Sequence, residues 1–152
     1  MQKIFILTII LAFSSINILA EEATETKMEE SAISEELSTE NWVSLAELVA
    51  THLESASTLY AENKSKEAKR EIISAYFGVF EDQKMEAAMR MELGAKYTYK
   101  VERRFGDLRK AIKKNLPIEE FNQQMQELIT IMRADAIKLD EAGIPREVFN
   151  VE

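Results

Sequence analysis

Beyond residue 41, hydrophobic residues recur every three or four positions, the spacing typical of amphipathic α-helices. A first helix is expected over residues 42–62, with an inward stripe of Trp42, Leu45, Val49, His52, Ala56 and Leu59. A second helix is expected to begin near Ser65, a favourable N-cap residue. Its apolar face is unusually wide and contains Ala68, Ile72, Ile73, Tyr76, Phe77, Val79 and Phe80. Strand-like alternation is absent, so the pattern predicts an all-α fold.

The apolar stripe of the second helix stops after Gln83. The next apolar residues fall on another side of the helix, and these are Met85, Met89 and Leu93. We therefore expect a kink or a short break near residues 82–84, because a continuous straight helix would keep its stripe in phase.

Two further helices are expected after this break. Gly94 separates the second helix from a third that runs to about Asn115, with Tyr97, Val101, Phe105, Leu108 and Ile112 inward. Pro117 can open a fourth helix, and Gly143 is a favourable residue to end it. The inward residues of the fourth helix are Ile118, Phe121, Met125, Leu128, Met132 and Leu139. Four amphipathic helices with short connections predict an antiparallel four-helix bundle with up-down-up-down topology.

The first twenty residues, MQKIFILTIILAFSSINILA, have the pattern of a secretory signal peptide. Lys3 provides a positive start, residues 4–13 are apolar, and Ala20 is a small residue at the expected cleavage site. The apolar run is shorter than the roughly 20 residues that span a bilayer, although an uncleaved anchor remains the alternative. We expect cleavage after Ala20, export to the periplasm, and no transmembrane segment in the mature chain.

The next segment, residues 21–40, is rich in Glu and nearly free of large apolar residues. Such a segment cannot bury enough surface to offset the entropy of ordering, so we expect a disordered, flexible acidic linker. The helical domain should therefore occupy residues 41–152. Its last residues, including Ile144, Val148 and Phe149, are expected to fold back on the bundle.

Composition excludes several classes of function. The 152 residues carry a formal net charge of -8, with no Cys and one His. An acidic exported domain is a poor candidate for binding nucleic acid, because phosphate binding requires a basic face. Without Cys there is no disulfide, thiolate metal site or thiol catalysis. Nucleotide-binding glycine motifs and the E-x-x-H pairs of di-iron bundles are also missing. We therefore expect no enzymatic activity, and a small enzyme centred on His52 and nearby carboxylates is the alternative.

A few polar residues lie on or beside the apolar stripes of four different helices. They are His52, Glu81, Glu102 and Asp135. A bundle can gather such N and O ligands around one metal, and iron, manganese, copper and zinc all fit this ligand type. The alternative for His52 is a core imidazole bonded to a backbone carbonyl or a carboxylate. The alternative for each carboxylate is an edge ion pair with Arg103, Arg104, Arg109 or Arg133.

Residues 75–89, AYFGVFEDQKMEAAM, and residues 100–112, KVERRFGDLRKAI, carry a further signal. Together they resemble the periplasmic N-terminal helical domain of bacterial high-affinity iron permeases. That domain combines an A-Y-[FL]-x-x-F-E segment, a Met/Leu-Glu pair, and an E-x-x-F-x-x-L-R segment on the next helix. The matching residues are Ala75, Tyr76, Phe77, Phe80, Glu81, Met85, Glu86, Glu102, Phe105, Leu108 and Arg109. The likeness covers roughly residues 42–115.

The membrane helices and R-E-G-L-E motifs of those permeases have no counterpart in this sequence. The resemblance therefore implies a stand-alone exported accessory protein of iron or other divalent-metal uptake. Such a protein would bind metal, dock on a membrane iron permease or another envelope protein, or do both. Under this interpretation the candidate metal ligands are Glu81, Glu102, His52, Glu86 and Asp135. The alternative is a metal-free helical adaptor or chaperone that binds a protein partner in the cell envelope.

Overall fold

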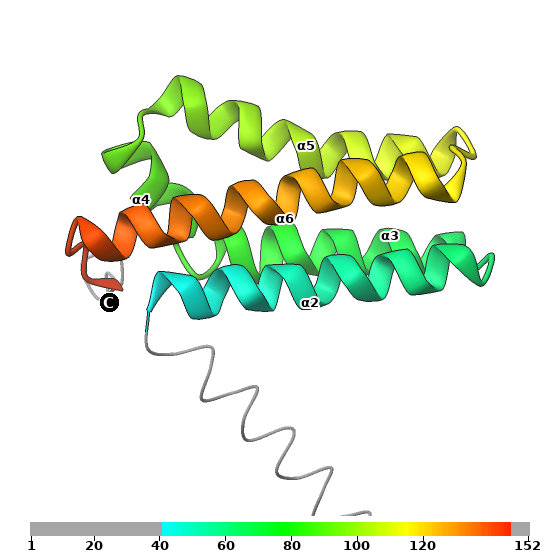
Figure 1. Cartoon of the computed structure of the whole chain (residues 1–152), viewed down its shortest axis with the longest axis horizontal. Helices are drawn as coiled ribbons and strands as arrows, with labels where there is room; N and C mark the ends of the chain where they lie inside the picture. Colours follow the sequence, from blue (N-terminus) through cyan, green and yellow to red (C-terminus); the bar gives the residue numbers. More distant parts are fainter. Residues whose placement is uncertain (1–40, 147–152) are drawn as a thin grey trace, which may run out of the picture. The chain divides into compact units, whose positions relative to one another are not determined.

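A computed structural model of the chain describes residues 41–146, which are helical apart from short connections (Figure 1). This range contains no strand. Its elements, in chain order, are α2 (Trp42–Ala61), α3 (Ser65–Ile73), the π-helical η1 (Ser74–Glu81), α4 (Met85–Glu92), α5 (Ala95–Lys113) and α6 (Ile118–Glu141). The all-α prediction is confirmed for residues 41–146. The expected signal peptide, the acidic linker, and Val148 and Phe149 lie outside the described residues.

Local sequence explains where the helices begin and end. The Asn41 side chain accepts a hydrogen bond from the Ser44 backbone N–H at 2.8 Å, which caps the start of α2. Lys84 has a left-handed backbone with φ of 65°, and it separates η1 from α4. Gly94 has φ of 89°, a conformation that favours glycine, and it separates α4 from α5. The break expected near residues 82–84 is therefore confirmed.

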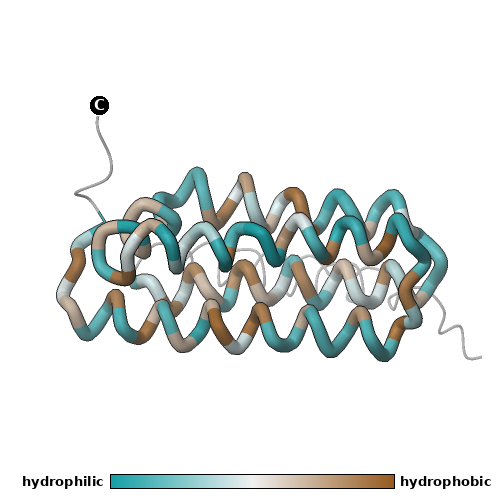
Figure 2. The backbone as a smooth tube through the Cα atoms, turned by 90° about the horizontal axis from the view of Figure 1, so that it is seen from above, coloured by the Kyte–Doolittle hydropathy of each residue, from teal (hydrophilic) through white to brown (hydrophobic). Residues whose placement is uncertain are grey.

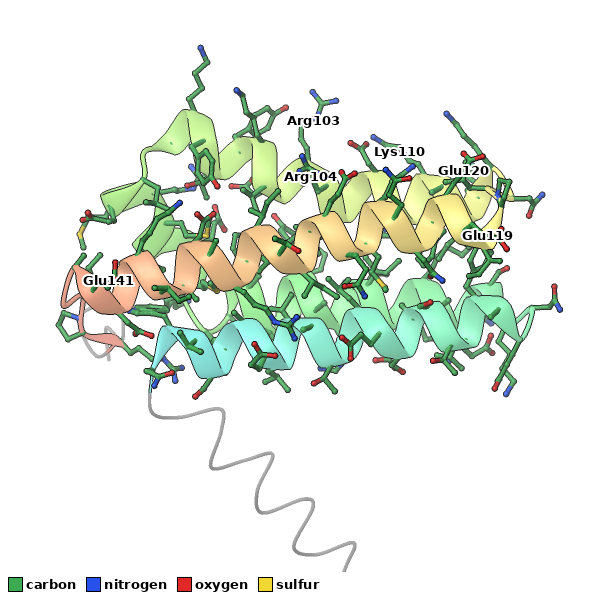
Figure 3. All side chains as sticks on the ribbon, viewed as in Figure 1. Arg103, Arg104, Lys110, Glu119, Glu120 and Glu141 are labelled. Carbon is green, nitrogen blue, oxygen red and sulfur yellow. The ribbon has the colours of Figure 1, made fainter. Side chains whose placement is uncertain are left out.

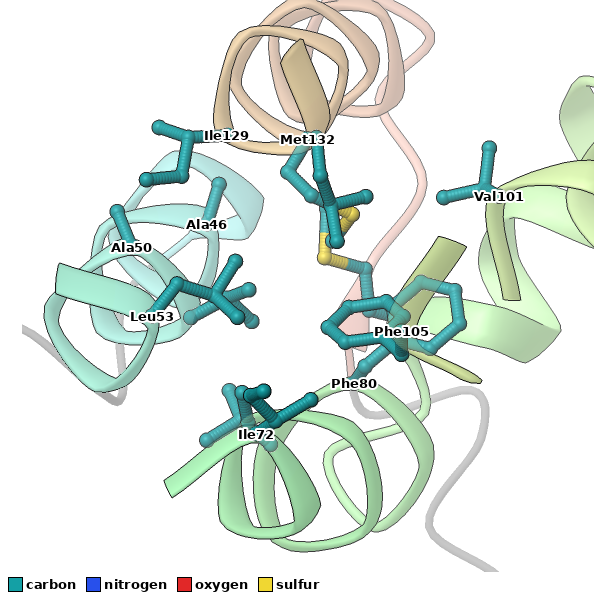
Figure 4. Close-up of a cluster of buried hydrophobic side chains, with 14 of the residues drawn as sticks. Ala46, Ala50, Leu53, Ile72, Phe80, Val101, Phe105, Ile129 and Met132 are labelled. Carbon is teal, nitrogen blue, oxygen red and sulfur yellow. The ribbon is translucent and has the colours of Figure 1, made fainter. Parts of the chain in front are cut away.

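All six elements contribute buried side chains to the core. Helix α2 packs against α3, η1 and α6, whereas α5 packs against α3, α4 and α6 (Figure 1). Hydrophobic residues recur along each helix (Figure 2). Five of the elements each contribute a labelled side chain to this cluster, namely Leu53, Ile72, Phe80, Phe105 and Met132 (Figure 4). Burying such a side chain contributes about 1.5–3 kcal/mol.

The wide apolar face expected over α3 and η1 is only partly buried. Phe77 is 48% exposed and Ile73 is 38% exposed, whereas Val79 and Phe80 are buried. The buried residues Ile72, Ala75 and Val79 keep the α-helical spacing of three or four residues, so Ile73 and Phe77 fall outside this stripe. The π-helical hydrogen bond from the Asp82 N–H to the Phe77 carbonyl at 3.0 Å widens the last turn, where Phe80 is buried beside Val79.

A side chain from the last turn of α6 caps the start of α2. The Asp140 carboxylate accepts hydrogen bonds from the backbone N–H groups of Trp42 at 2.9 Å and Val43 at 3.1 Å. A carboxylate at this position satisfies orphan donors and suits the positive end of the helix dipole. The Trp42 indole N–H also donates to the Ile144 carbonyl at 2.7 Å. The prediction that the chain folds back is thus confirmed as far as Ile144.

Replacing Asp140 tests this end-to-end contact. Asp140→Ala should lower the free energy of unfolding by about 1–2 kcal/mol, because two N–H groups at the start of α2 lose their acceptor. Urea unfolding followed by circular dichroism measures the change. Glu141→Ala is the matched control, since it removes the same charge from the neighbouring exposed position (Figure 3), and it should change stability by less than about 0.5 kcal/mol. Equal losses in the two variants would contradict the assignment.

Candidate functional site

The π-helical segment places Tyr76 against α5. The centroid of the Tyr76 ring lies 4.7 Å from that of Phe77 and 5.4 Å from that of Phe105. Phe80 packs against Phe105 at a centroid distance of 5.5 Å. Aromatic pairs at these separations contribute about 0.5–1.5 kcal/mol beyond area burial. The aromatic cluster therefore fixes η1 on α5, and π-helical turns occur frequently at functional sites.

Several charged groups lie around the Tyr76 hydroxyl. Partial burial raises the pKa of Tyr76, and the negative charges of Glu102, Glu81 and Glu86 raise this pKa further. The positive charge of Arg90 acts in the opposite direction. Three carboxylates from η1, α4 and α5 thus influence the pKa of one phenol.

Arg90 joins two of these carboxylates. Its Nε donates to Glu86 Oε1 at 2.6 Å within α4, and its Nη2 donates to Glu102 Oε1 on α5 at 2.8 Å. The side chain of Arg90 is 46% exposed, whereas those of Glu86 and Glu102 are 19% and 14% exposed. Charge-assisted hydrogen bonds of this kind are short and strong. The two partly buried carboxylates therefore hold one cation at the surface.

The carboxylate of Glu86 disfavours the ionised form of Glu102. Burial raises the pKa of Glu102, and the hydrogen bonding and negative charge of Glu86 raise it as well. The Arg90 guanidinium opposes these effects. Without a cation between them, the two carboxylates would repel each other, because like charges disfavour ionisation at close range.

His52 lies in a separate interaction between α2 and α3. Its Nδ1 is 2.8 Å from Glu71 Oε2, and the imidazole side chain is 30% exposed. A carboxylate partner is the alternative that the sequence left open for His52. Its expected place among the ligands of one metal with Glu81 and Glu102 is not observed.

Asp135 lies in a third environment, between α5 and α6. Its side chain is buried, although the sequence places it just off the apolar stripe. The Tyr97 hydroxyl donates to Asp135 Oδ2 at 2.7 Å, and the Lys138 ammonium donates to Oδ1 at 2.8 Å. These partners satisfy the buried carboxylate. Tyr97 was expected to face inward but is 37% exposed. The partial burial of its hydroxyl, together with the hydrogen bond to Asp135 and the negative charge of Asp135, raises the pKa of Tyr97 to about 12.

The five predicted ligands thus fall into three groups rather than one. Glu86 and Glu102 meet at Arg90, and Glu81 acts with them on the pKa of Tyr76. His52 and Asp135 have other partners. Within residues 41–146, no three His, Cys, Asp or Glu side chains are arranged to hold one metal ion. Arg90 was not among the predicted site residues, although its spacing of four residues from Glu86 is the usual signal for a helical ion pair.

In the same part of the chain, no helix combines the length and the apolarity that crossing a bilayer requires. Comparisons with protein-family models, curated proteins and solved structures gave no match. The likeness to iron-permease domains therefore stays a prediction from the sequence.

The pKa of Glu102 provides a direct test of the shared cation. Arg90→Gln should raise this pKa further, because it removes the guanidinium, whereas Glu86→Gln should lower it. Carboxyl-detected NMR titration measures both changes, with Glu119→Gln as a distant control. A raised folded-state pKa means that the contribution of Glu102 to stability is lost as pH rises through that value. An unchanged pKa in Arg90→Gln would contradict the geometry.

A second pH prediction concerns the hydrogen bond between Tyr97 and Asp135. In the wild type, one tyrosine should ionise near pH 12, and Tyr97→Phe should remove that last phase of the phenolate absorbance titration. The contribution of Tyr97 to stability should be lost as pH rises through about 12. Tyr99→Phe, at a 55% exposed position of the same helix, should leave the last phase in place. Its disappearance in Tyr99→Phe would show that the phase belongs to another residue.

Proposed function

We propose that the chain is an exported accessory protein of iron or other divalent-metal uptake. In this proposal the signal peptide is cleaved after Ala20, and the mature protein is an antiparallel four-helix bundle in the periplasm. The observation that carries the proposal is the convergence of Glu86 and Glu102 on one exposed cation, Arg90. The two carboxylates and Glu81 are also residues that the likeness to permease domains selects from the sequence.

The cation held by Glu86 and Glu102 is the guanidinium of Arg90, and a metal ion would take its place. Carboxylate oxygens suit iron and manganese in their common oxidation states, and water would fill the remaining coordination positions. Arg90 can leave the two carboxylates because its side chain is 46% exposed, so water can solvate the released guanidinium. We therefore regard Arg90 as an internal competitor that keeps metal binding reversible.

A protein partner would meet the chain beside this cluster. Phe77 and Ile73 are 48% and 38% exposed, and Met91 on α4 is 59% exposed. Phe77 packs against Tyr76 at a centroid distance of 4.7 Å, and Met91 follows Arg90 in α4. These exposed apolar side chains next to the proposed metal site would suit docking on a membrane permease or another envelope protein. The same side chains support the second candidate, a metal-free helical adaptor or chaperone that binds an envelope protein.

Metal titration tests the proposal. Calorimetry with the mature chain, residues 21–152, should detect binding of anaerobic ferrous iron, manganese, zinc or copper with a Kd near or below about 1 μM. Arg90→Ala should tighten binding by about tenfold, because it removes the competing cation. Glu86→Gln combined with Glu102→Gln should weaken binding by at least about tenfold.

The matched control is Glu119→Gln combined with Glu120→Gln. These exposed residues lie in the first turn of α6 (Figure 3), and their replacement removes the same two charges. If neither the wild type nor Arg90→Ala binds any of the metals, the metal site is wrong and the adaptor becomes the better candidate. Equal weakening in both double variants would assign the effect to overall charge.

A further inference from the structure

Helix α5 is strongly basic although the chain as a whole has a formal net charge of -8. Its only acidic residues are Glu102 and Asp107. Its basic residues are Lys96, Lys100, Arg103, Arg104, Arg109, Lys110 and Lys113. Successive residues of a helix are rotated by about 100°, so Arg103 lies on a different side of α5 from Glu102. Lys100, Arg103 and Lys110 share one side of α5 with Asp107, and this side is therefore predominantly basic.

A cleft opens between the basic side of α5 and helix α6. It has a volume of about 390 Å³ and is lined by Lys100, Arg103, Arg104, Asp107 and Leu108 of α5, together with Gln124 of α6. Arg103 and Arg104 project from the middle of α5 (Figure 3). The volume lies within the range of about 300–1,000 Å³ that is usual for small-ligand sites.

The positive charge of this cleft is only partly neutralised. Asp107 is engaged by Lys110, whose Nζ lies 2.9 Å from its Oδ1. Arg104 pairs with Glu127 of α6, which lies outside the cleft lining, at 3.3 Å. Lys100 and Arg103 form no ion pair with any carboxylate of residues 41–146. The cleft therefore holds two cationic groups whose hydrogen-bond donors are directed at solvent.

We propose that this cleft binds a small ligand that carries two or more anionic oxygen groups, either phosphates or carboxylates. Lys100 supplies a flexible ammonium and Arg103 a planar guanidinium, and this pair of donors matches the oxygens of such an anion. The Gln124 carboxamide adds a neutral donor from the opposite wall. Leu108 supplies the apolar contact that a small organic anion requires. This site is independent of the carboxylate cluster and of the function proposed for it.

Titration with simple polyanions tests the site. Inorganic pyrophosphate and citrate should each be tested by calorimetry against the mature chain at low ionic strength, where at least one should bind with a Kd of about 100 μM or below. Lys100→Gln combined with Arg103→Gln should weaken that binding by at least about tenfold. Neither residue takes part in an ion pair within residues 41–146, so the variant should keep the stability of the wild type.

The matched control is Lys113→Gln combined with Lys114→Gln, which removes two charges at the end of α5 and outside the cleft. This variant should change the Kd by less than about twofold. Failure of the wild type to bind either anion at about 1 mM, or equal weakening in both double variants, would overturn the proposal. Cardiolipin vesicles, whose lipid headgroup carries two phosphates, distinguish a lipid headgroup from a free anion. Vesicle binding lost only in the Lys100/Arg103 variant would identify a headgroup phosphate as the ligand, whereas equal loss in both variants would count against the cleft.

Discussion

The hydrogen-bond register of the π-helical segment η1 decides how the middle of the chain meets the rest. In this register Val79 and Phe80 enter the core, while Phe77 remains at the surface. In an ordinary α-helix each hydrogen-bonded loop contains one residue fewer, so the side chains that follow would point to other sides of the helix. The same segment brings Tyr76 against Phe105 and ends at Glu81. The position of the carboxylate cluster therefore depends on the wider turn.

Arg90 makes it possible for the negative charges of Glu86 and Glu102 to lie close together. Glu86 and Glu102 are largely shielded from solvent, and two ionised carboxylates so placed would destabilise the fold without a cation. The guanidinium of Arg90 supplies that cation within the chain itself. The proximity of the two acids is thus a structural fact, and metal exchange at this position is the functional proposal that it supports. Binding at the cluster would always include the cost of displacing Arg90.

Much of the fold could be predicted from hydrophobic periodicity and helix-end residues. The starts of α2 and α3, the break near Lys84 and the helix that follows Pro117 all agree with the sequence. Periodicity could not predict η1, because it assumes 3.6 residues per turn throughout. The candidate site was harder to predict, since helix rotation decides which polar residues meet. Glu86 and Glu102 do come together, whereas His52 instead pairs with Glu71 and Asp135 with Tyr97.

The contact between Asp140 and the start of α2 has a consequence for the order of synthesis. A polypeptide is made from its N-terminus, so α2 exists for most of that time without the carboxylate that caps it. The Trp42 indole likewise lacks its acceptor until Ile144 has been added. The N–H groups at the start of α2 therefore gain these acceptors only when residues near the C-terminal end of the domain have been made. Premature termination anywhere before Asp140 would leave the N–H groups that it binds without that acceptor, a difference by which quality control could distinguish unfinished chains from finished ones.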